Sequence, residues 1–173
     1  MSATRLESRS LIVDTYSIWR NKLNAKKIIT ALSLFALSLS AIASDNESKA
    51  DANRALVIKV MQTTFVNRDT SMVASQFASN YIQHNPRIPN GRDAIPPLIS
   101  GLPKDFRYEM GTVVAQGDFV MVHGRYTGWG PKPVIAVDIF RVADGKLAEH
   151  WDVLQPEVPA ASSANGNPMF VAP

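Results

Sequence analysis

A carboxylate in the middle of an apolar stretch is the first candidate for chemistry in this sequence. Asp138 lies within VIAVDIFRV, residues 134–142, whose composition is that of a buried β-strand. A strand that buries its face avoids a charge unless the charge is paired or has a task. In an apolar cavity, desolvation raises the pKa of a carboxyl group, whereas a neighbouring imidazolium lowers it. The two effects together can hold an acid–base group close to working pH.

His123 is a candidate partner of Asp138 from the preceding strand. The two strands are joined by a loop rich in proline and glycine, residues 128–133. If this loop closes symmetrically, His123 lies opposite Asp138, and Arg125 lies opposite Ala136. Neighbouring strands are roughly 5 Å apart, so the imidazole and the carboxylate would be close enough to interact.

The following hairpin decides whether His150 joins them. A two-residue turn at Asp144-Gly145 pairs Asp138 with Trp151, whereas a three-residue loop pairs Asp138 with His150. Both turns suit these residues. We favour the three-residue loop because it separates two sets of side chains, and the buried face of a strand fixes its register. One face then carries Ile135, Val137, Ile139, Leu147, Trp151 and Val153, and the other carries Ala136, Asp138, Phe140, Ala148, His150 and Asp152.

In this register, His123, Asp138 and His150 form one row across three adjacent strands. The row would face an internal cavity, with Met121 and Phe140 beside it. A row of this kind predicts acid–base catalysis. A strand carboxylate can also have a purely structural task, as the ion-pair partner of an arginine or a histidine.

The elements that must position these residues follow an α+β pattern. Apolar spacing predicts a helix over 55–65, a second short helix after Asp69 and a third beginning near Asp93. Alternating residues between tight turns then predict four strands, at 107–116, 118–128, 133–142 and 146–154. Helices followed by an antiparallel meander indicate a curved sheet with helices against one face, which makes a cone with a cavity inside.

The N-terminal part of the chain has the layout of a secretory signal peptide. Residues 28–43 form an uncharged apolar run that follows two lysines and ends in Ala41-Ile42-Ala43. The 27 residues before the run are too long for the ordinary N-terminal region of a signal peptide, and a start at Leu23 would give a leader of standard length. We expect cleavage near Ala43 and a periplasmic or secreted mature protein.

Composition also limits the number of domains, the disulfides and the charge that the mature protein can have. The chain has 173 residues and no cysteine, which indicates one domain without disulfides. Six of the 18 basic and two of the 15 acidic residues lie before residue 44, which leaves 12 basic and 13 acidic ones. No basic patch then argues for nucleic acid. We expect a flexible start at 44–53, a domain over 54–156 and an irregular tail over 157–173.

Several segments together resemble the SnoaL-like polyketide-cyclase group of the nuclear-transport-factor-2-like (cystatin-like) superfamily. They are YIQHNP with Asn90-Gly91 shortly after it, VHGRYTG at 122–128, DIFRVADGKLAEHWDV at 138–153 and the closing SANGNPMF. The resemblance covers roughly residues 52–170. It implies a cone-shaped α+β barrel that is often a homodimer packed through the outer sheet face, where Trp151 would suit the contact.

The resemblance also implies roles for individual residues. The Asp that opens the DIFR segment, here Asp138, is the general acid/base of cyclases that close an aldol ring without metal or cofactor. His123 would polarise or orient the substrate, and His84 would line the pocket mouth. Arg125 is either a clamp for a substrate carboxylate or the ion-pair partner of an acidic residue such as Asp138 or Glu109. Candidates for the pocket wall are Tyr81, Phe106, Trp129 and Phe140.

Three functions remain open from the sequence. The first is a cofactor-free lyase or isomerase that uses Asp138, His123 and His150 on a small carbonyl compound. The second is a non-catalytic periplasmic binder of a small apolar ligand. The third is a metal site built from His84, the other two histidines and Asp138. No local metal motif supports the third function, so we expect neither a metal nor a cofactor.

Overall fold

The computed structural model describes residues 44–172, and the fold concerns the unit that begins at Asn46. The predicted signal peptide and its cleavage site lie outside the described residues. Within residues 44–172, no helix is long and apolar enough to cross a membrane.

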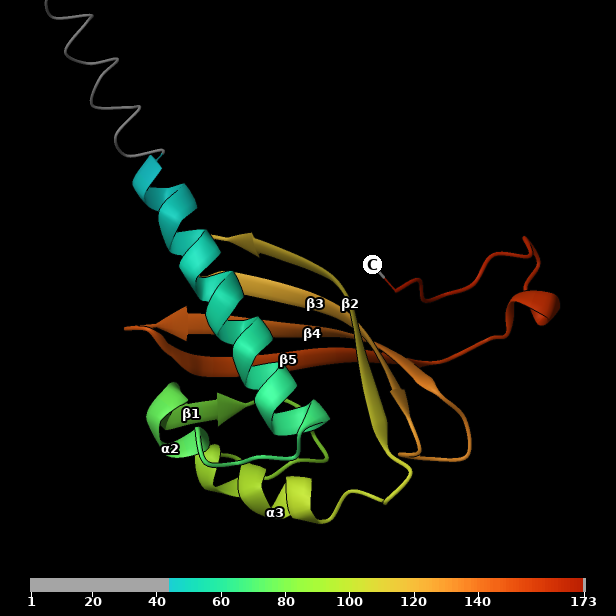
Figure 1. Cartoon of the computed structure of the whole chain (residues 1–173), viewed down its shortest axis with the longest axis horizontal. Helices are drawn as coiled ribbons and strands as arrows, with labels where there is room; N and C mark the ends of the chain where they lie inside the picture. The colour runs from blue at the N-terminus through green and yellow to red at the C-terminus, as the bar shows by residue number, and fades with distance from the viewer. Residues whose placement is uncertain (1–43, 173) are drawn as a thin grey trace, which may run out of the picture. The chain divides into compact units, whose positions relative to one another are not determined.

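A long N-terminal helix covers one face of the sheet (Figure 1). Residues 44–61 are α-helical and continue into a π-helical turn, η1 (Gln62–Val66). Val57, Val60 and Met61 repeat with helical spacing and are fully buried, so the helix has one apolar face toward the sheet. The predicted helix is confirmed, and residues 44–53, for which we expected a flexible start, are part of it.

The sheet has five strands in the order β1-β5-β4-β3-β2. The last four strands along the chain form the predicted antiparallel meander, whereas β1 pairs with β5 in parallel. The α+β fold class is confirmed as a curved, open sheet with an N-terminal helix. The strands are β1 (Phe77–Gln83), β2 (Arg107–Gln116), β3 (Phe119–Thr127), β4 (Val134–Ala143) and β5 (Lys146–Pro156).

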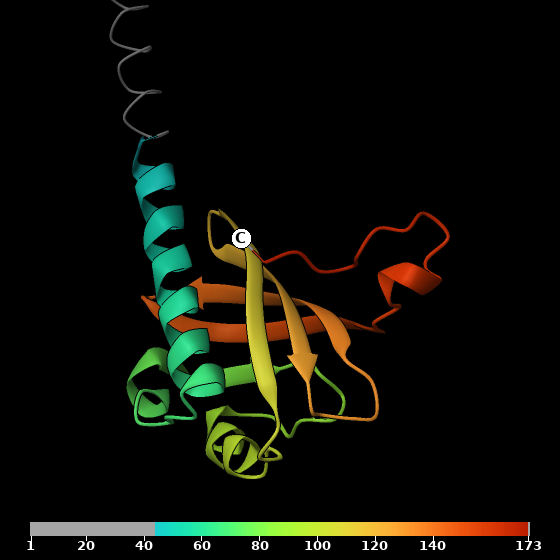
Figure 2. The same ribbon diagram turned by 45° about the vertical axis from the view of Figure 1, so that its right-hand side comes forward.

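Short helices close one end of the sheet. Figures 1 and 2 show β1 with α2 and α3 beyond its edge, below the long helix. The second and third predicted helices are present but short. They are α2 (Val73–Gln76), η2 (Arg92–Ala94) and α3 (Ile95–Ser100), and the tail holds only η3 (Ala160–Ser162).

The register between β3 and β4 differs by one residue from the symmetric loop closure that the sequence suggested. Asp138 pairs with Val122, and His123 pairs with Val137. Because successive side chains of a strand point to opposite faces, this shift places His123 and Asp138 on different faces of the sheet. The predicted row of His123, Asp138 and His150 is therefore wrong.

The hairpin between β4 and β5 follows neither predicted register. The turn is the two-residue one, with Asp144 at φ 51° and Gly145 at φ 68°, as a tight primed turn requires. A bulge then follows, because Val142 pairs with Leu147 whereas Arg141 pairs with Glu149. The extra residue in β5 restores the face that the three-residue loop predicted, but it sets Asp138 opposite Asp152.

The core lies between the long helix and the concave face of the sheet. It includes Val57, Val60 and Met61 from the helix together with Val120 and Phe140 from the strands. Burying a large apolar side chain stabilises a fold by about 1.5–3 kcal/mol. Against this background, the buried polar groups of β4 and β5 stand out: Asp138 and His150.

Candidate functional site

Asp138 is a buried carboxylate on the concave face, with 2% of its surface exposed. Its two oxygens have different partners. The hydroxyl of Tyr126, on the adjacent strand β3, donates to Oδ2 at 2.9 Å. Nε2 of His150, on the other adjacent strand β5, lies 3.3 Å from Oδ1. Partners from both neighbouring strands therefore hold Asp138 in place, which explains how a buried strand accommodates a carboxylate.

Gln83 fixes the tautomer of His150. Its Oε1 accepts the backbone N–H of Asn85 at 2.9 Å and therefore acts as an acceptor. The same oxygen lies 2.9 Å from Nδ1 of His150, so Nδ1 must be the donor and carry a proton. Nε2 then faces Asp138 favourably only if a proton lies between them. Nε2 of His150 and Oδ1 of Asp138 therefore lie where a proton can pass between them.

Asp152 is a second carboxylate beside this pair. It lies directly opposite Asp138 on β5 and is half-buried. The side-chain amide of Asn85 donates to its Oδ2. The orientation of this amide is fixed, because Asn85 Oδ1 accepts the backbone N–H of Arg87 at 2.8 Å. Two facing carboxylates repel each other when both are charged, and the donors Tyr126 and Asn85 offset this repulsion.

Three tyrosines, each in its neutral form, surround the carboxylates. Burial is the main cause that raises the pKa of Tyr81, Tyr108 and Tyr126, and the charge of Asp138 raises all three further. Tyr108 and Tyr126 pack with ring centroids 4.7 Å apart. The Tyr108 ring lies so close to Gly124 that a Cβ there would be 2.6 Å from a ring carbon, so this position requires glycine.

A narrow cavity reaches these groups from outside. Its volume is about 30 Å³, enough for a few water-sized groups. It therefore admits a small head group but not a polycyclic ring system. Most of its lining is apolar, and its polar groups come from the cluster just described. Tyr81, Trp129 and Phe140 line it as predicted, together with Gln83, Asp138, His150 and Asp152.

Phe106, also predicted for the pocket wall, lies behind it. The residue is buried, and its ring centroid is 6.0 Å from that of Tyr126 and 6.3 Å from that of Trp129. Phe106 therefore supports two aromatic side chains that line the cavity rather than lining it itself.

Two predicted site residues on β3 lie on the outer face. His123 packs against Phe170 of the C-terminal tail, with ring centroids 5.6 Å apart. Arg125 forms ion pairs with Glu157 at 2.8 Å and Glu109 at 3.1 Å, so the pairing with Glu109 is confirmed. These carboxylates raise the pKa of Arg125. Met121, expected beside Asp138, is exposed.

His84 also lies on the outer face and not at the pocket mouth. Its ring stacks on Trp151, with centroids 4.5 Å apart and planes 4° apart. Its Nε2 lies 3.2 Å from Glu149, which is also bonded to Arg141. The hydrogen bond from Arg141 is the largest cause that lowers the pKa of Glu149, and the contact with His84 adds to it.

The predicted four-residue metal set is not assembled, because His84 and His123 lie on the other face from Asp138. Among residues 44–172, Asp138, His150 and Asp152 offer ligand atoms within 4.8 Å of one another. Each of them already has a hydrogen-bonding partner: Tyr126 donates to Asp138, Gln83 accepts from His150 and Asn85 donates to Asp152. These partners orient the three side chains.

Sequence reasoning missed four members of this cluster: Gln83, Asn85, Tyr126 and Asp152. Alternation along β5 gave a usable signal for Asp152, because it places Asp152 on the same face as His150. Gln83 and Asn85 flank His84 in QHNP. Because side chains alternate along a strand, the predicted site residue His84 points away from the cavity, whereas its two neighbours point toward it. This could be found only by recognising β1 as a strand.

Comparison with known proteins places the chain in a family. The sequence model described as the SnoaL-like domain matches residues 57–150. A search of curated proteins finds no match. Solved structures with a similar fold include a putative ketosteroid isomerase from Kribbella flavida, with 20% identity, coverage of 62% of this chain and 80% of that one, and a TM-score of 0.55.

Two further solved structures agree with this fold. An NTF2-like protein of unknown function from Mesorhizobium loti is 19% identical, covering 62% of this chain and 93% of its own, with a TM-score of 0.54. A putative SnoaL-like polyketide cyclase from Jannaschia is 17% identical, with coverages of 61% and 87% and a TM-score of 0.51. At these identities the likeness shows the fold.

Proposed function

Because this chain belongs to the SnoaL-like domain family, we propose that it is a cofactor-independent enzyme that moves a proton on a small carbonyl compound, as an aldol-type lyase or cyclase or as an isomerase. The observation that carries the proposal is the setting of Asp138. It is a buried carboxylate at the end of a narrow apolar cavity, with a proton-sharing imidazole on one side and a phenol donor on the other.

In the proposed reaction, Asp138 takes the proton from the carbon next to the carbonyl group. The electron pair of the broken C–H bond moves into the enolate, whose negative charge develops on the carbonyl oxygen. His150 and Tyr126 hold the carboxylate in position and stabilise its charge before the transfer. The proton returns to another atom of the same molecule, so that no external reductant or oxidant is needed.

Tyr81 is the proposed donor to the carbonyl oxygen. Its hydroxyl accepts a hydrogen bond from Gln83 Nε2 at 3.4 Å, which leaves the phenol proton available to the cavity. Burial and the charges of Asp138 and Asp152 raise the pKa of Tyr81, so it stays protonated and can donate. A donor aimed at the developing oxyanion lowers the barrier to enolate formation.

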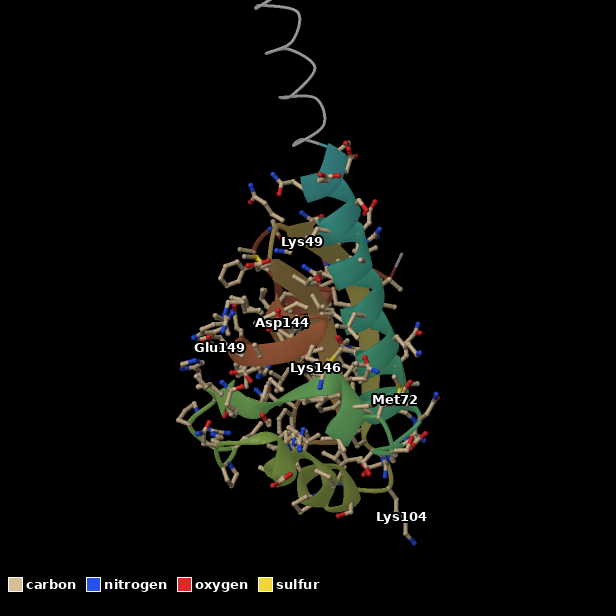
Figure 3. The ribbon with its side chains drawn as sticks, turned by 90° about the vertical axis from the view of Figure 1, so that its left-hand side faces the viewer. Lys49, Met72, Lys104, Asp144, Lys146 and Glu149 are labelled. Carbon is tan, nitrogen blue, oxygen red and sulfur yellow. The ribbon has the colours of Figure 1, made fainter. Side chains whose placement is uncertain are left out.

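The proposal is tested by hydrogen–deuterium exchange at carbon. The protein is incubated in D2O with a panel of small ketones, and proton NMR follows loss of the signal next to the carbonyl group. We expect exchange above the buffer rate with the wild type and a loss of about 10²–10⁴-fold in Asp138→Asn. The matched control is Asp144→Asn, which makes the same chemical change at the hairpin turn (Figure 3), where asparagine also tolerates positive φ.

The alternative function is a binder of a small apolar ligand, which the mostly apolar lining of the cavity favours. A binder would show no exchange with any ketone of the panel, and Asp138→Asn would keep its affinity for the ligand. Equal exchange rates in the wild type and in a folded Asp138→Asn variant would refute the assignment of Asp138 as the acid–base group.

A further inference from the structure

A second, larger chamber lies outside the narrow cavity. Its volume is about 410 Å³, which is large enough for the body of a small organic molecule. Its walls come from the loop after β1, from α3, from the loop between β3 and β4, and from the end of β5. Ile88, Leu98 and Trp129 line both the chamber and the cavity, so the two spaces adjoin along these side chains.

The chamber carries positive charge and no negative charge. Arg87 and Lys132 are the charged residues of its lining. Both are exposed, and neither side chain forms a hydrogen bond or an ion pair with another residue in 44–172. Other basic residues in 44–172, away from the chamber, are paired, such as Lys49 with Asp118 and Arg141 with Glu149. Two unpaired cations in one concave space favour an anionic ligand.

A short path of hydrogen bonds connects the chamber with the catalytic cluster. The backbone N–H of Arg87 donates to Asn85 Oδ1, and Asn85 in turn donates to Asp152 in the cavity. These two bonds fix the backbone of Arg87 in space relative to the carboxylates of the cavity. A ligand held at Arg87 would thus be positioned with respect to the reacting end of the site.

We propose that the outer chamber binds the carboxylate end of the substrate, whose carbonyl end enters the narrow cavity. The substrate class is then an oxo acid: a carbonyl group, an apolar middle that passes Ile88, Leu98 and Trp129, and a terminal carboxylate that pairs with Arg87 and Lys132. The assignment of the carbonyl end rests on the proposed function, whereas the assignment of the carboxylate end rests on the chamber alone.

The test compares two ligands that differ only in charge. 6-Oxoheptanoate carries a small methyl ketone, an apolar alkyl chain and a terminal carboxylate, and 6-oxoheptanamide replaces the carboxylate with a neutral amide. Dissociation constants are measured by NMR titration of the full chain at low and high salt. We expect the acid to bind more tightly than the amide, by roughly threefold for each ion pair, and the preference to shrink in high salt.

Charge-neutralising variants identify the source of the preference. Arg87→Gln and Lys132→Gln should each weaken binding of the acid by roughly threefold and leave binding of the amide unchanged, and the double variant should remove the preference. The control is Lys104→Gln, since Lys104 points away from the protein at its lower end (Figure 3) and should have no effect.

The two proposals can fail separately, because binding is measured without turnover. Equal affinities of acid and amide for the wild type would overturn the carboxylate site even if ketones exchange their protons. A preference that survives in the double variant would also overturn it. A preference that is retained in Asp138→Asn supports the chamber as an independent anion site.

Discussion

Replacing Tyr126 with phenylalanine removes one hydroxyl group from the interior of the sheet and leaves the packing of the ring unchanged. The hydroxyl donates to Asp138 Oδ2 at 2.9 Å, and both residues are almost fully buried. After the substitution, this oxygen has lost its donor at the end of the narrow, mostly apolar cavity. The variant therefore measures how much the stability of the fold depends on this hydrogen bond to the carboxylate of Asp138.

The magnitude follows from the kind of bond that is lost. A hydrogen bond to a charged group contributes about 1.5–3 kcal/mol to stability, more than a neutral one, because the unpaired charge is costly to bury. Asp138 keeps its contact with His150, so the lower half of this range is the expected loss in the free energy of unfolding. We expect Tyr126→Phe to destabilise the protein by about 2 kcal/mol.

The same substitution at Tyr108 is a matched control. Tyr108 lies on the adjacent strand β2, its ring packs on Tyr126, and its hydroxyl is also buried. Within the described residues this hydroxyl has no hydrogen-bonding partner. Removing an unsatisfied buried hydroxyl takes away a desolvation penalty, so Tyr108→Phe should leave stability unchanged or raise it by about 1 kcal/mol.

Guanidinium unfolding of the wild type and both variants at neutral pH gives the comparison. The reasoning requires the two tyrosine substitutions to differ by roughly 2–3 kcal/mol in the stated direction, with unchanged denaturant slopes. Equal losses in both variants would refute it, because the effect would then come from the removal of any hydroxyl. A stable Tyr126→Phe variant would show that Asp138 does not depend on this donor.

Two further predictions concern the same cluster. The pKa values of Tyr81, Tyr108 and Tyr126 are raised in the folded protein, so these side chains stay protonated there when the tyrosines of the unfolded chain ionise near pH 10. These groups should therefore leave the free energy of unfolding unchanged below pH 10. Above pH 10 they should lower it by up to about 4 kcal/mol per pH unit. Unfolding between pH 9 and 11 in a Tyr16→Phe background checks this, and ionisation of the three near pH 10 in the folded state would contradict it. In Gln83→Leu, His150 should lose its fixed tautomer, which nitrogen NMR of the imidazole detects; an unchanged Nδ1 signal would mean that Gln83 does not hold that proton.

The sequence predicted the fold class and most of the faces of β4 and β5, because alternation is a property of each strand alone. Leu147, which was assigned to the face of Trp151, is instead buried in the core. Asp138, Phe140 and His150 were assigned to the concave face, and all three are buried there. The pairing of these strands could not be predicted, since one bulged residue in β5 changes the partners beyond it and leaves Leu147, between the turn and the bulge, on the core face. The same reasoning gave the correct face for His150 and the wrong one for His123, whose position depends on a long loop.

The QHNP segment shows a different limit of prediction from the sequence. His84 is the residue type most often used in catalysis, and the resemblance to the SnoaL-like cyclases implied that His84, and not Gln83 or Asn85, lines the pocket mouth. The structure reverses this choice because β1 joins the sheet in parallel beside β5, with Gln83 opposite His150. Pairing between distant segments thus decides which side chain faces the cavity, and local periodicity carries no information about it.

The same pairing links the stability of β1 with the state of the site. Near the site, β1 meets β5 through Gln83 opposite His150 and through the N–H of His84, which donates to the backbone oxygen of His150 at 2.9 Å. Two side-chain bonds add to this contact, from His150 to Gln83 and from Asn85 to Asp152. Parallel pairing is slightly less stable per residue than antiparallel pairing, so these polar bonds help to hold the edge in register. The residues that orient the proton of His150 are therefore also the residues that close the sheet beside the cavity. A change in protonation at Asp138, His150 or Asp152 would act on the chemistry and on the position of the Arg87 loop together.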